Sequence, residues 1–192
     1  QKAIMTADFF SDEHFSQLTK NDLKTGEYEA CSFSNCQFPE ADLSFFRFID
    51  CDFTECDLSN ARLKGTSFQN CTFTGCKMIG LNFENCEKFG FSIGAKNSIL
   101  THCTFYQLSL PKSIFIGCKF EGADFTEAIF TYSNFQECDF LNAIFERTQL
   151  EKCDFRNAQN FLIDPERNQV FHAKFSKDTL TGLLQKYQLT IE

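Results

Sequence analysis

The sequence contains no tryptophan and only three prolines among 192 residues, which departs from average globular usage. It has no run of 18 apolar residues, so no membrane-spanning helix is expected. The first residues lack a basic segment followed by an apolar run, so no signal peptide is predicted. An excess of positive charge is also missing. The net charge of −8 argues against direct binding to nucleic acid and permits a basic partner, such as a protein that itself binds DNA.

Motifs for catalysis and for cofactors are missing as well. The three histidines, His14, His102 and His172, are scattered along the chain, and no Ser/His/Asp or paired-carboxylate spacing recurs. No glycine-rich phosphate motif is present. These absences favour a protein that is not an enzyme and that needs no cofactor or metal.

Phenylalanine is abundant, with 26 residues, and it recurs at every fifth position. Thirteen consecutive fifth positions from residue 23 to 83 are apolar, and so are eleven from 105 to 155. In the best-formed stretch these central residues are Phe33, Phe38, Leu43, Phe48, Phe53, Leu58, Leu63, Phe68, Phe73, Met78 and Phe83. A period of five is neither the 3.6 of an amphipathic helix nor the 2.0 of a half-buried strand. A fixed short period indicates a solenoid.

The cysteines follow the same period, two residues before each central position. All eleven do so: Cys31, Cys36, Cys51, Cys56, Cys71, Cys76, Cys86, Cys103, Cys118, Cys138 and Cys153. Free cysteine is a small, readily buried hydrophobe, and no Cys-x2-Cys pair suggests zinc. We therefore expect reduced thiols in the core and a reducing compartment, the cytoplasm.

A second period of twenty is superimposed on the first, because Cys31, Cys51 and Cys71 are equivalent. The simplest geometry is a square coil with one pentad per side. With coils stacked at strand spacing, about 4.8 Å, the pattern predicts about six full coils and a rod roughly 30 Å long. Phe83 and Phe105 are 22 residues apart, so two residues are inserted, and Gly90 and Gly94 suit a loop there.

Three segments carry a family resemblance: 41–45 (Ala-Asp-Leu-Ser-Phe), 56–60 (Cys-Asp-Leu-Ser-Asn) and 123–127 (Ala-Asp-Phe-Thr-Glu). They resemble the pentapeptide-repeat family, whose consensus is Ala-Asp/Asn-Leu-x-x, over roughly residues 16 to 160. The resemblance implies an all-β solenoid, a right-handed quadrilateral β-helix. Large residues stand in the small position at Phe46, Leu81 and Leu108, where we expect local widening.

The sequence suggests three parts: an N-terminal cap (1–20) with Phe9, Phe10 and Phe15 over the open end, the β-helix (21–160) with a small insertion near 87–97, and a C-terminal helix module (161–192). Ser176 suits a helix N-cap, and an apolar stripe at helical spacing follows it.

The C-terminal module either caps the last coil or caps it and also forms a two-fold dimer. Its helix is predicted as α, with a short terminal strand at residues 189–191. The candidate dimer-interface residues are Phe171, Phe175, Leu180, Leu183, Leu184, Tyr187, Leu189 and Ile191.

The tail, with Ile163-Asp164-Pro165 and a leucine-rich helix, is similar to that of the topoisomerase-protecting branch of the family, which includes the Qnr-type quinolone-resistance proteins. This resemblance implies a tail-to-tail dimer that presents DNA-like shape and charge to DNA gyrase or topoisomerase IV. Qnr-type proteins carry projecting loops, and here only the insertion near 87–97 corresponds to one.

Carboxylates recur immediately before central residues, at Asp42, Asp52, Asp57, Asp124, Asp139 and Asp154. They form either a solubilising surface or a charge lattice that imitates phosphates, although a duplex carries denser charge, one per about 1.7 Å of axis. Outward isoleucines at 114, 116, 129 and 144 suggest a contact surface. The first hypothesis is an acidic rod that binds a type II topoisomerase and protects it from a quinolone or peptide toxin. The alternative is a structural or adaptor protein with another protein partner.

Overall fold

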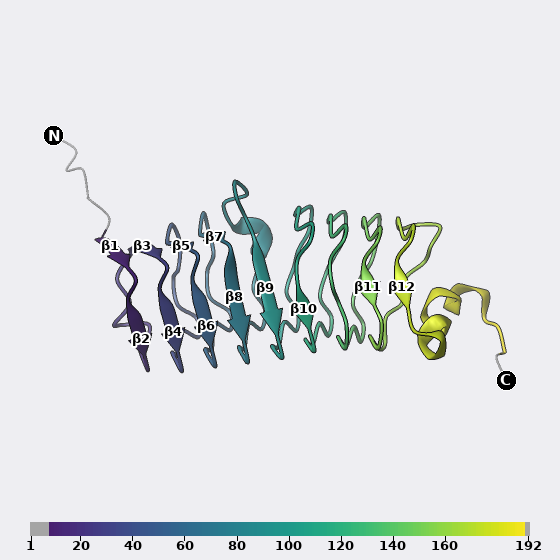
Figure 1. Cartoon of the computed structure of the whole chain (residues 1–192), viewed down its shortest axis with the longest axis horizontal. Helices are drawn as coiled ribbons and strands as arrows, with labels where there is room; N and C mark the ends of the chain where they lie inside the picture. Colours follow the sequence, from purple (N-terminus) through teal and green to yellow (C-terminus); the bar gives the residue numbers. More distant parts are fainter. Residues whose placement is uncertain (1–7, 191–192) are drawn as a thin grey trace.

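The computed structural model describes residues 8–190, which form an elongated parallel β-solenoid of about eight turns (Figure 1). This confirms the predicted fold class. Its strands are β1 (Asp8–Ser11), β2 (His14–Ser16), β3 (Gly26–Glu29), β4 (Ser32–Ser34), β5 (Arg47–Ile49), β6 (Asp52–Thr54), β7 (Ser67–Gln69), β8 (Cys71–Thr74), β9 (Ile93–Lys96), β10 (Phe115–Ile116), β11 (Asp154–Phe155) and β12 (Lys174–Phe175). The short 3₁₀ helices are η1 (Phe83–Asn85), η2 (Lys177–Leu183) and η3 (Gln185–Tyr187).

Each coil has four sides, which we name after the central residues of the coil 41–60: the Leu43, Phe48, Phe53 and Leu58 sides. The four-stranded sheet β1-β3-β5-β7 forms the Phe48 side, and the six-stranded sheet β10-β9-β8-β6-β4-β2 forms the Phe53 side. Isolated parallel bridges such as Asp42↔Arg62 and Gln37↔Asp57 continue the other two sides. Strand pairing advances by twenty residues per turn, as in Phe33↔Phe53↔Phe73.

Alternation of side chains explains the core. Phe53 is buried and its ring stacks between those of Phe33, at 4.7 Å, and Phe73, at 4.8 Å. The chain is long enough to bury such a column because each coil covers the one before it. Packing of this density makes the loss of any ring costly.

The small position holds groups that donate hydrogen bonds to a carbonyl of the preceding coil. The Cys51 thiol donates to the Tyr28 carbonyl at 3.3 Å, and the Cys71 thiol to that of Phe48 at 3.3 Å. The Thr148 hydroxyl occupies an equivalent position and donates to the Phe125 carbonyl at 2.9 Å. A thiol or hydroxyl therefore suits this position better than alanine, since it adds a donor without adding bulk. All eleven cysteines are free and buried.

The large residues in the small position leave the backbone unchanged. Phe46 and Leu108 are buried. The hydrogen bond that closes the turn is 3.1 Å long from the Phe46 amide to the Leu43 carbonyl, as it is from the Ala61 amide to the Leu58 carbonyl. The widening expected at these positions is therefore wrong for the backbone, because ring stacking of Phe46 with Phe48 absorbs the extra volume.

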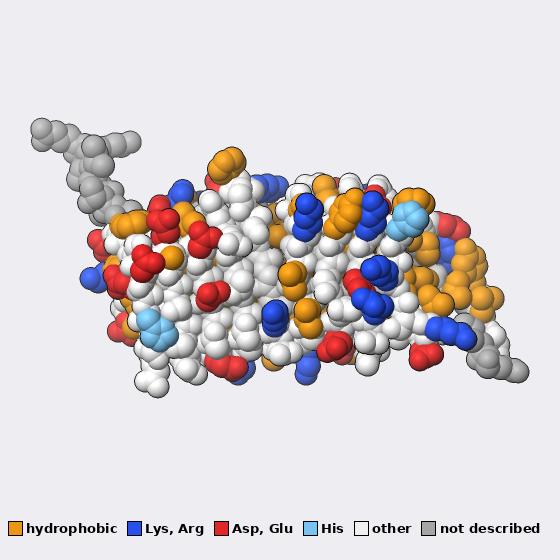
Figure 2. Space-filling view, viewed as in Figure 1, with side chains coloured by type: hydrophobic (Ala, Val, Ile, Leu, Met, Phe, Trp, Pro, Cys, Tyr) orange, Lys and Arg blue, Asp and Glu red, His pale blue; other side chains and the backbone are white. Residues whose placement is uncertain are grey.

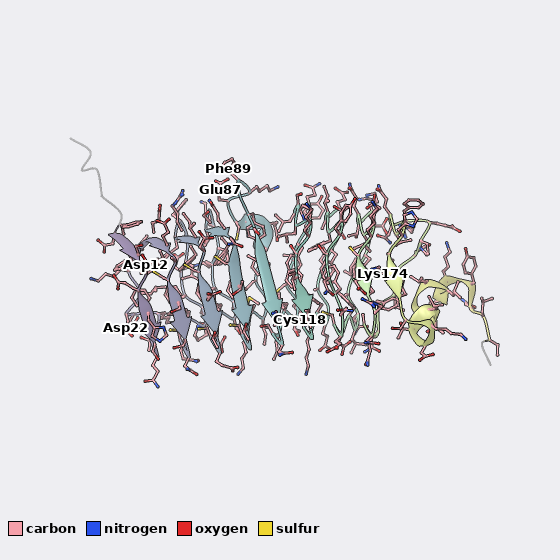
Figure 3. The ribbon with its side chains drawn as sticks, in the orientation of Figure 1. Asp12, Asp22, Glu87, Phe89, Cys118 and Lys174 are labelled. Atoms are coloured by element: carbon pink, nitrogen blue, oxygen red, sulfur yellow. The ribbon has the colours of Figure 1, made fainter. Side chains whose placement is uncertain are left out.

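The insertion forms a projecting loop, residues 87–92, between two coils (Figures 1 and 3). Cys71 pairs with Ile93, so the register advances by 22 residues here instead of 20. Gly90 lies in the turn with φ of +70°, whereas Gly94 lies in β9 and not in the loop. Phe89 at the tip is 82 % exposed.

Both ends differ from the sequence expectation. Residues 8–16 are not only a cap, because β1 and β2 pair in register with β3 and β4 and add a coil. Phe9 is 59 % exposed and does not cover the core, whereas Phe10 and Phe15 do pack against it. The prediction of about six coils was low because the coils at both ends were left out of the count. None of the helices in residues 8–190 is long and apolar enough to cross a membrane.

The C-terminal helix begins after Ser176, as predicted, but it is wound as 3₁₀ turns and not as an α-helix. The Gly182 carbonyl, which an α-helix would pair four residues ahead, accepts the Ile163 amide at 3.0 Å. Thr179, Thr181 and Gly182 are also weak α-helix formers. Residues 189–190 form no strand, so the predicted terminal strand is wrong in this described part, and Ile191 lies outside the described residues.

Candidate partner-binding surface

The six predicted aspartates lie on three different sides of the solenoid. Asp42 and Asp124 lie on the Leu43 side, reached through the bridges Asp42↔Arg62 and Thr104↔Asp124. Asp52 and Asp154 lie on the Phe53 side, and Asp57 and Asp139 on the Leu58 side. The structure therefore does not bring the six carboxylates into one row, although each projects outward from its strand.

Several of these carboxylates have a cation beside them in the next coil. Asp42 lies 3.2 Å from the Arg62 guanidinium, and hydrogen bonds from Ser44, with this guanidinium, hold the pKa of Asp42 below its ordinary value. The pKa of Asp154 is lowered chiefly by the hydrogen-bonded Arg156 guanidinium at 2.6 Å. Asp57 is paired with Lys77 in the backbone ladder. The local field of these aspartates is thus partly cancelled.

The negative charge is concentrated at the N-terminal end. Residues 1–60 contain twelve of the 26 acidic residues and four of the 18 basic ones, whereas residues 61–192 contain fourteen of each. The entire net charge of −8 therefore belongs to the first 60 residues. On the face shown in Figure 2, red side chains gather at the N-terminal end and blue ones in the other half. Counting charge in windows of the sequence would have revealed this segregation.

We call the exposed carboxylates of residues 8–60 the N-terminal acidic surface. Its members are Asp8, Asp12, Glu13, Asp22, Glu29, Glu40, Asp42, Asp50, Asp52 and Glu55. Only one close ion pair besides that of Asp42 involves this segment within the described chain, Arg47 with the half-buried Glu27 at 2.7 Å. Of the predicted aspartates, Asp42 and Asp52 belong to this surface, and the half-buried Asp57 adjoins it. Asp124, Asp139 and Asp154 lie in the neutral half.

The other half carries a column of basic and aromatic side chains at one corner of the coil. Its members are Lys112, Tyr132, Lys152 and His172, each one turn from the next. The Lys152 ammonium donates to the Tyr132 hydroxyl at 2.8 Å and lies 4.7 Å from the centre of its ring. This column offsets the acidic groups of the same coils.

The predicted dimer-interface residues divide into two groups. Phe175 and Leu183 pack against the core, and the Phe175 ring stacks on Phe155 at 5.2 Å, so they serve the cap. Leu184 is half-buried. Exposed members form an apolar end surface with Leu162, which sequence analysis missed: Phe171, Leu180, Tyr187 and Leu189. This surface forms the orange cluster at the C-terminal end in Figure 2.

The C-terminal module is fixed to the last coil by specific hydrogen bonds. The Ser176 hydroxyl accepts the Asn157 amide at 2.9 Å and makes no bond to its own helix, so the predicted N-cap residue acts as a link to the last coil. Lys186 forms ion pairs with Asp164 at 2.8 Å and Glu166 at 2.7 Å. The apolar end surface is therefore presented on a firmly attached module.

Comparison with known proteins agrees with this geometry. The family model described as "Pentapeptide repeats" matches residues 51–87, 96–126 and 118–157, with 8 copies. Two trypsin-treated forms of QnrB1, a plasmid-mediated fluoroquinolone resistance protein, are similar at TM-scores of 0.62 and 0.63, each with 20% identity, 97% of this chain covered and 98% or 99% of the other. Full-length QnrB1 is similar at 0.51 with 20% identity, covering 95% and 100%. No curated protein matches by sequence. The structural likenesses show the fold.

Proposed function

The chain belongs to the pentapeptide-repeat family, and from this premise we propose that it is a binding protein for a type II topoisomerase, DNA gyrase or topoisomerase IV. It occupies part of the surface on which the enzyme holds DNA and so protects the enzyme from a poison such as a quinolone or a peptide toxin. Catalysis has no part in this proposal, because binding alone lowers the number of cleaved complexes that a poison traps.

The N-terminal acidic surface is the observation that carries the proposal. A protein that holds DNA presents positive charge to it, and a rigid rod with exposed carboxylates on several sides is attracted to the same positive charge. Because residues 61–192 are neutral overall, imitation of DNA is restricted to the N-terminal coils. The fold shared with QnrB1, a fluoroquinolone resistance protein, supports the proposal at the level of architecture.

Charge reversal on this surface is the direct test. Changing Glu29 and Glu55 to lysine is expected to weaken binding to purified gyrase or topoisomerase IV by about tenfold or more, since close charges at an interface contribute strongly to association. Binding is measured by calorimetry, and protection by DNA supercoiling or decatenation in the presence of the poison.

The matched control changes Glu121 and Glu137, exposed residues in the neutral half, to lysine. This variant undergoes the same change in net charge, and its affinity is expected to stay within about twofold of the original. Equal loss in both variants would reduce the effect to overall charge. Absence of any binding by the unchanged protein to either enzyme would contradict the proposal itself.

We also propose that the protein is a homodimer joined through the apolar end surface. Changing Leu180 and Leu189 to aspartate is expected to convert dimer to monomer in light scattering while circular dichroism stays unchanged, because both side chains are exposed. Phe89→Asp, at the equally exposed tip of the projecting loop, is the control and should remain dimeric. A monomeric unchanged protein would refute the proposal. The eleven free thiols suit the reducing cytoplasm.

A second candidate function is a structural or adaptor role with another protein partner. The observation in its favour is the neutral half, where Ile114 and Ile144 are 50% and 53% exposed. Exposed isoleucines on a neutral surface fit an apolar protein contact better than a charged one. A pull-down in which Ile114→Asp and Ile144→Asp abolish capture, and in which no topoisomerase subunit is recovered, would favour this role.

A further inference from the structure

The two ends of the solenoid are finished differently. At the C-terminal end, η2 and η3 cover the last coil, and the Ile163 amide donates to the Gly182 carbonyl at 3.0 Å. At the other end, β1 and β2 are the edge strands of their sheets, and within residues 8–190 no strand pairs with their outer edges (Figure 1). A free edge of a sheet offers unpaired amides and carbonyls to a further strand.

The side of the end coil next to these strands closes its own edge. The Thr19 amide, which would otherwise point away from the solenoid, donates to the Asp22 carboxylate at 2.8 Å. Within the described chain, no such side-chain cap is made to the amides of β1 and β2. The open edge is therefore confined to the Phe48 and Phe53 sides.

Aromatic side chains at this end are incompletely covered. The Phe10 ring stacks on Tyr28 at 4.6 Å, and the Phe15 ring stacks on Phe33 at 5.0 Å, but both remain half-exposed. Phe9 is 59 % exposed. A strand added to β1 would cover apolar surface as well as satisfy backbone groups.

The rim of the open edge is negatively charged. Asp8 lies in β1, and Asp12 and Glu13 lie between β1 and β2; all three are exposed. Asp12 and Asp22 are labelled at this end in Figure 3. Residues 8–19 contain no lysine or arginine. The rim repels a second copy of the same end and attracts a cationic segment.

We propose that the open edge of β1 binds an extended peptide segment rich in lysine or arginine, which adds to the four-stranded sheet as a further strand. Backbone hydrogen bonds to the edge would supply affinity, and the carboxylate rim would select for positive charge. This end-on site is distinct from the lateral acidic surface of the proposed function and does not depend on a topoisomerase partner.

The test uses the full chain and a fluorescent peptide of alternating lysine and valine, with binding followed by anisotropy at low salt. Asp12→Asn with Glu13→Gln is expected to weaken binding about fivefold, since it removes two charges at the rim. Asparagine suits the positive φ of residue 12, 56°. The matched variant Glu121→Gln with Glu137→Gln is expected to stay within about twofold.

Backbone pairing is tested separately from charge. A peptide of the same sequence, N-methylated on alternate residues, loses the amide donors that pair with an edge and is expected to bind at least about tenfold more weakly. Equal binding of the methylated peptide would overturn the proposal, as would unchanged binding by the Asp12/Glu13 variant. Deleting residues 1–7 should leave affinity within about twofold. Binding that arises only after this deletion, or concentration-dependent end-to-end assembly without peptide binding, would assign the edge to another occupant and refute the proposal.

Discussion

Replacing Phe125 with alanine is expected to lower the free energy of unfolding by about 3–5 kcal/mol, the range for loss of a buried phenylalanine. Phe125 is fully buried, and its ring stacks between Phe105 at 5.2 Å and Phe145 at 4.8 Å. We expect the upper part of the range because aromatic pairs contribute about 0.5–1.5 kcal/mol beyond the area they bury. Urea denaturation monitored by circular dichroism measures the change.

Phe89→Ala is the matched control for this experiment. The same ring is removed, but Phe89 is 82 % exposed at the tip of the projecting loop. Its loss is expected to change the free energy of unfolding by no more than about 0.5 kcal/mol, as for surface substitutions in general. If the two variants lost equal stability, the phenylalanine column would not be the main source of cohesion between coils.

Raising the pH from 9 to 11 is expected to destabilise the protein more steeply than the same step does for a typical globular domain. Burial raises the pKa of the Cys36 and Cys51 thiols to about 11 and that of the Cys103 and Cys153 thiols to about 12. In the unfolded chain these thiols ionise near pH 8.5–9. The folded state then holds more protons, so stability is fully present below about pH 9 and is lost as pH rises through the folded pKa values.

The size of the effect follows from the number of thiols. A shift of about two pKa units corresponds to roughly 2–3 kcal/mol per buried thiol at the end of its titration. Four such groups would exceed the whole stability of an ordinary domain, about 5–15 kcal/mol, in part or entirely. Melting temperature is measured at pH 7, 9 and 10.5 under reducing conditions. A Cys51→Ala variant should show a shallower decline, and a decline that begins below pH 8 would point to groups other than the thiols.

Much of the fold follows from local arithmetic on the sequence. A period of five with an apolar centre places Phe33, Phe120 and their equivalents inside, and the structure buries them. The cysteines were predicted inside for the same reason, and all eleven are buried. These predictions succeed because a solenoid repeats one environment, so each residue depends mainly on its position within the pentad and on its neighbours one turn away.

The ends could not be predicted in the same way, because there the repeat has no neighbour to impose it. Residues 8–16 lack the period yet pair with the next coil, since the edge of that coil offers hydrogen bonds to any extended segment. The C-terminal stripe of leucines predicts an α-helix, but the last coil takes the Gly182 carbonyl for Ile163 and leaves 3₁₀ turns. A contact between segments about twenty residues apart overrides the local preference.

The sequence alone determined the solenoid, its buried phenylalanines and cysteines, and the position of the two-residue insertion, because these depend on a period that can be counted. Tertiary structure decided which outward residues share a side, where charge is cancelled, and which end is left open. Asp42, Asp52 and Asp57 look equivalent in sequence, yet they face three directions, because each fifth residue turns the chain through one corner of the coil. Whether outward residues form a common surface therefore depends on the coil geometry as well as on their place in the pentad.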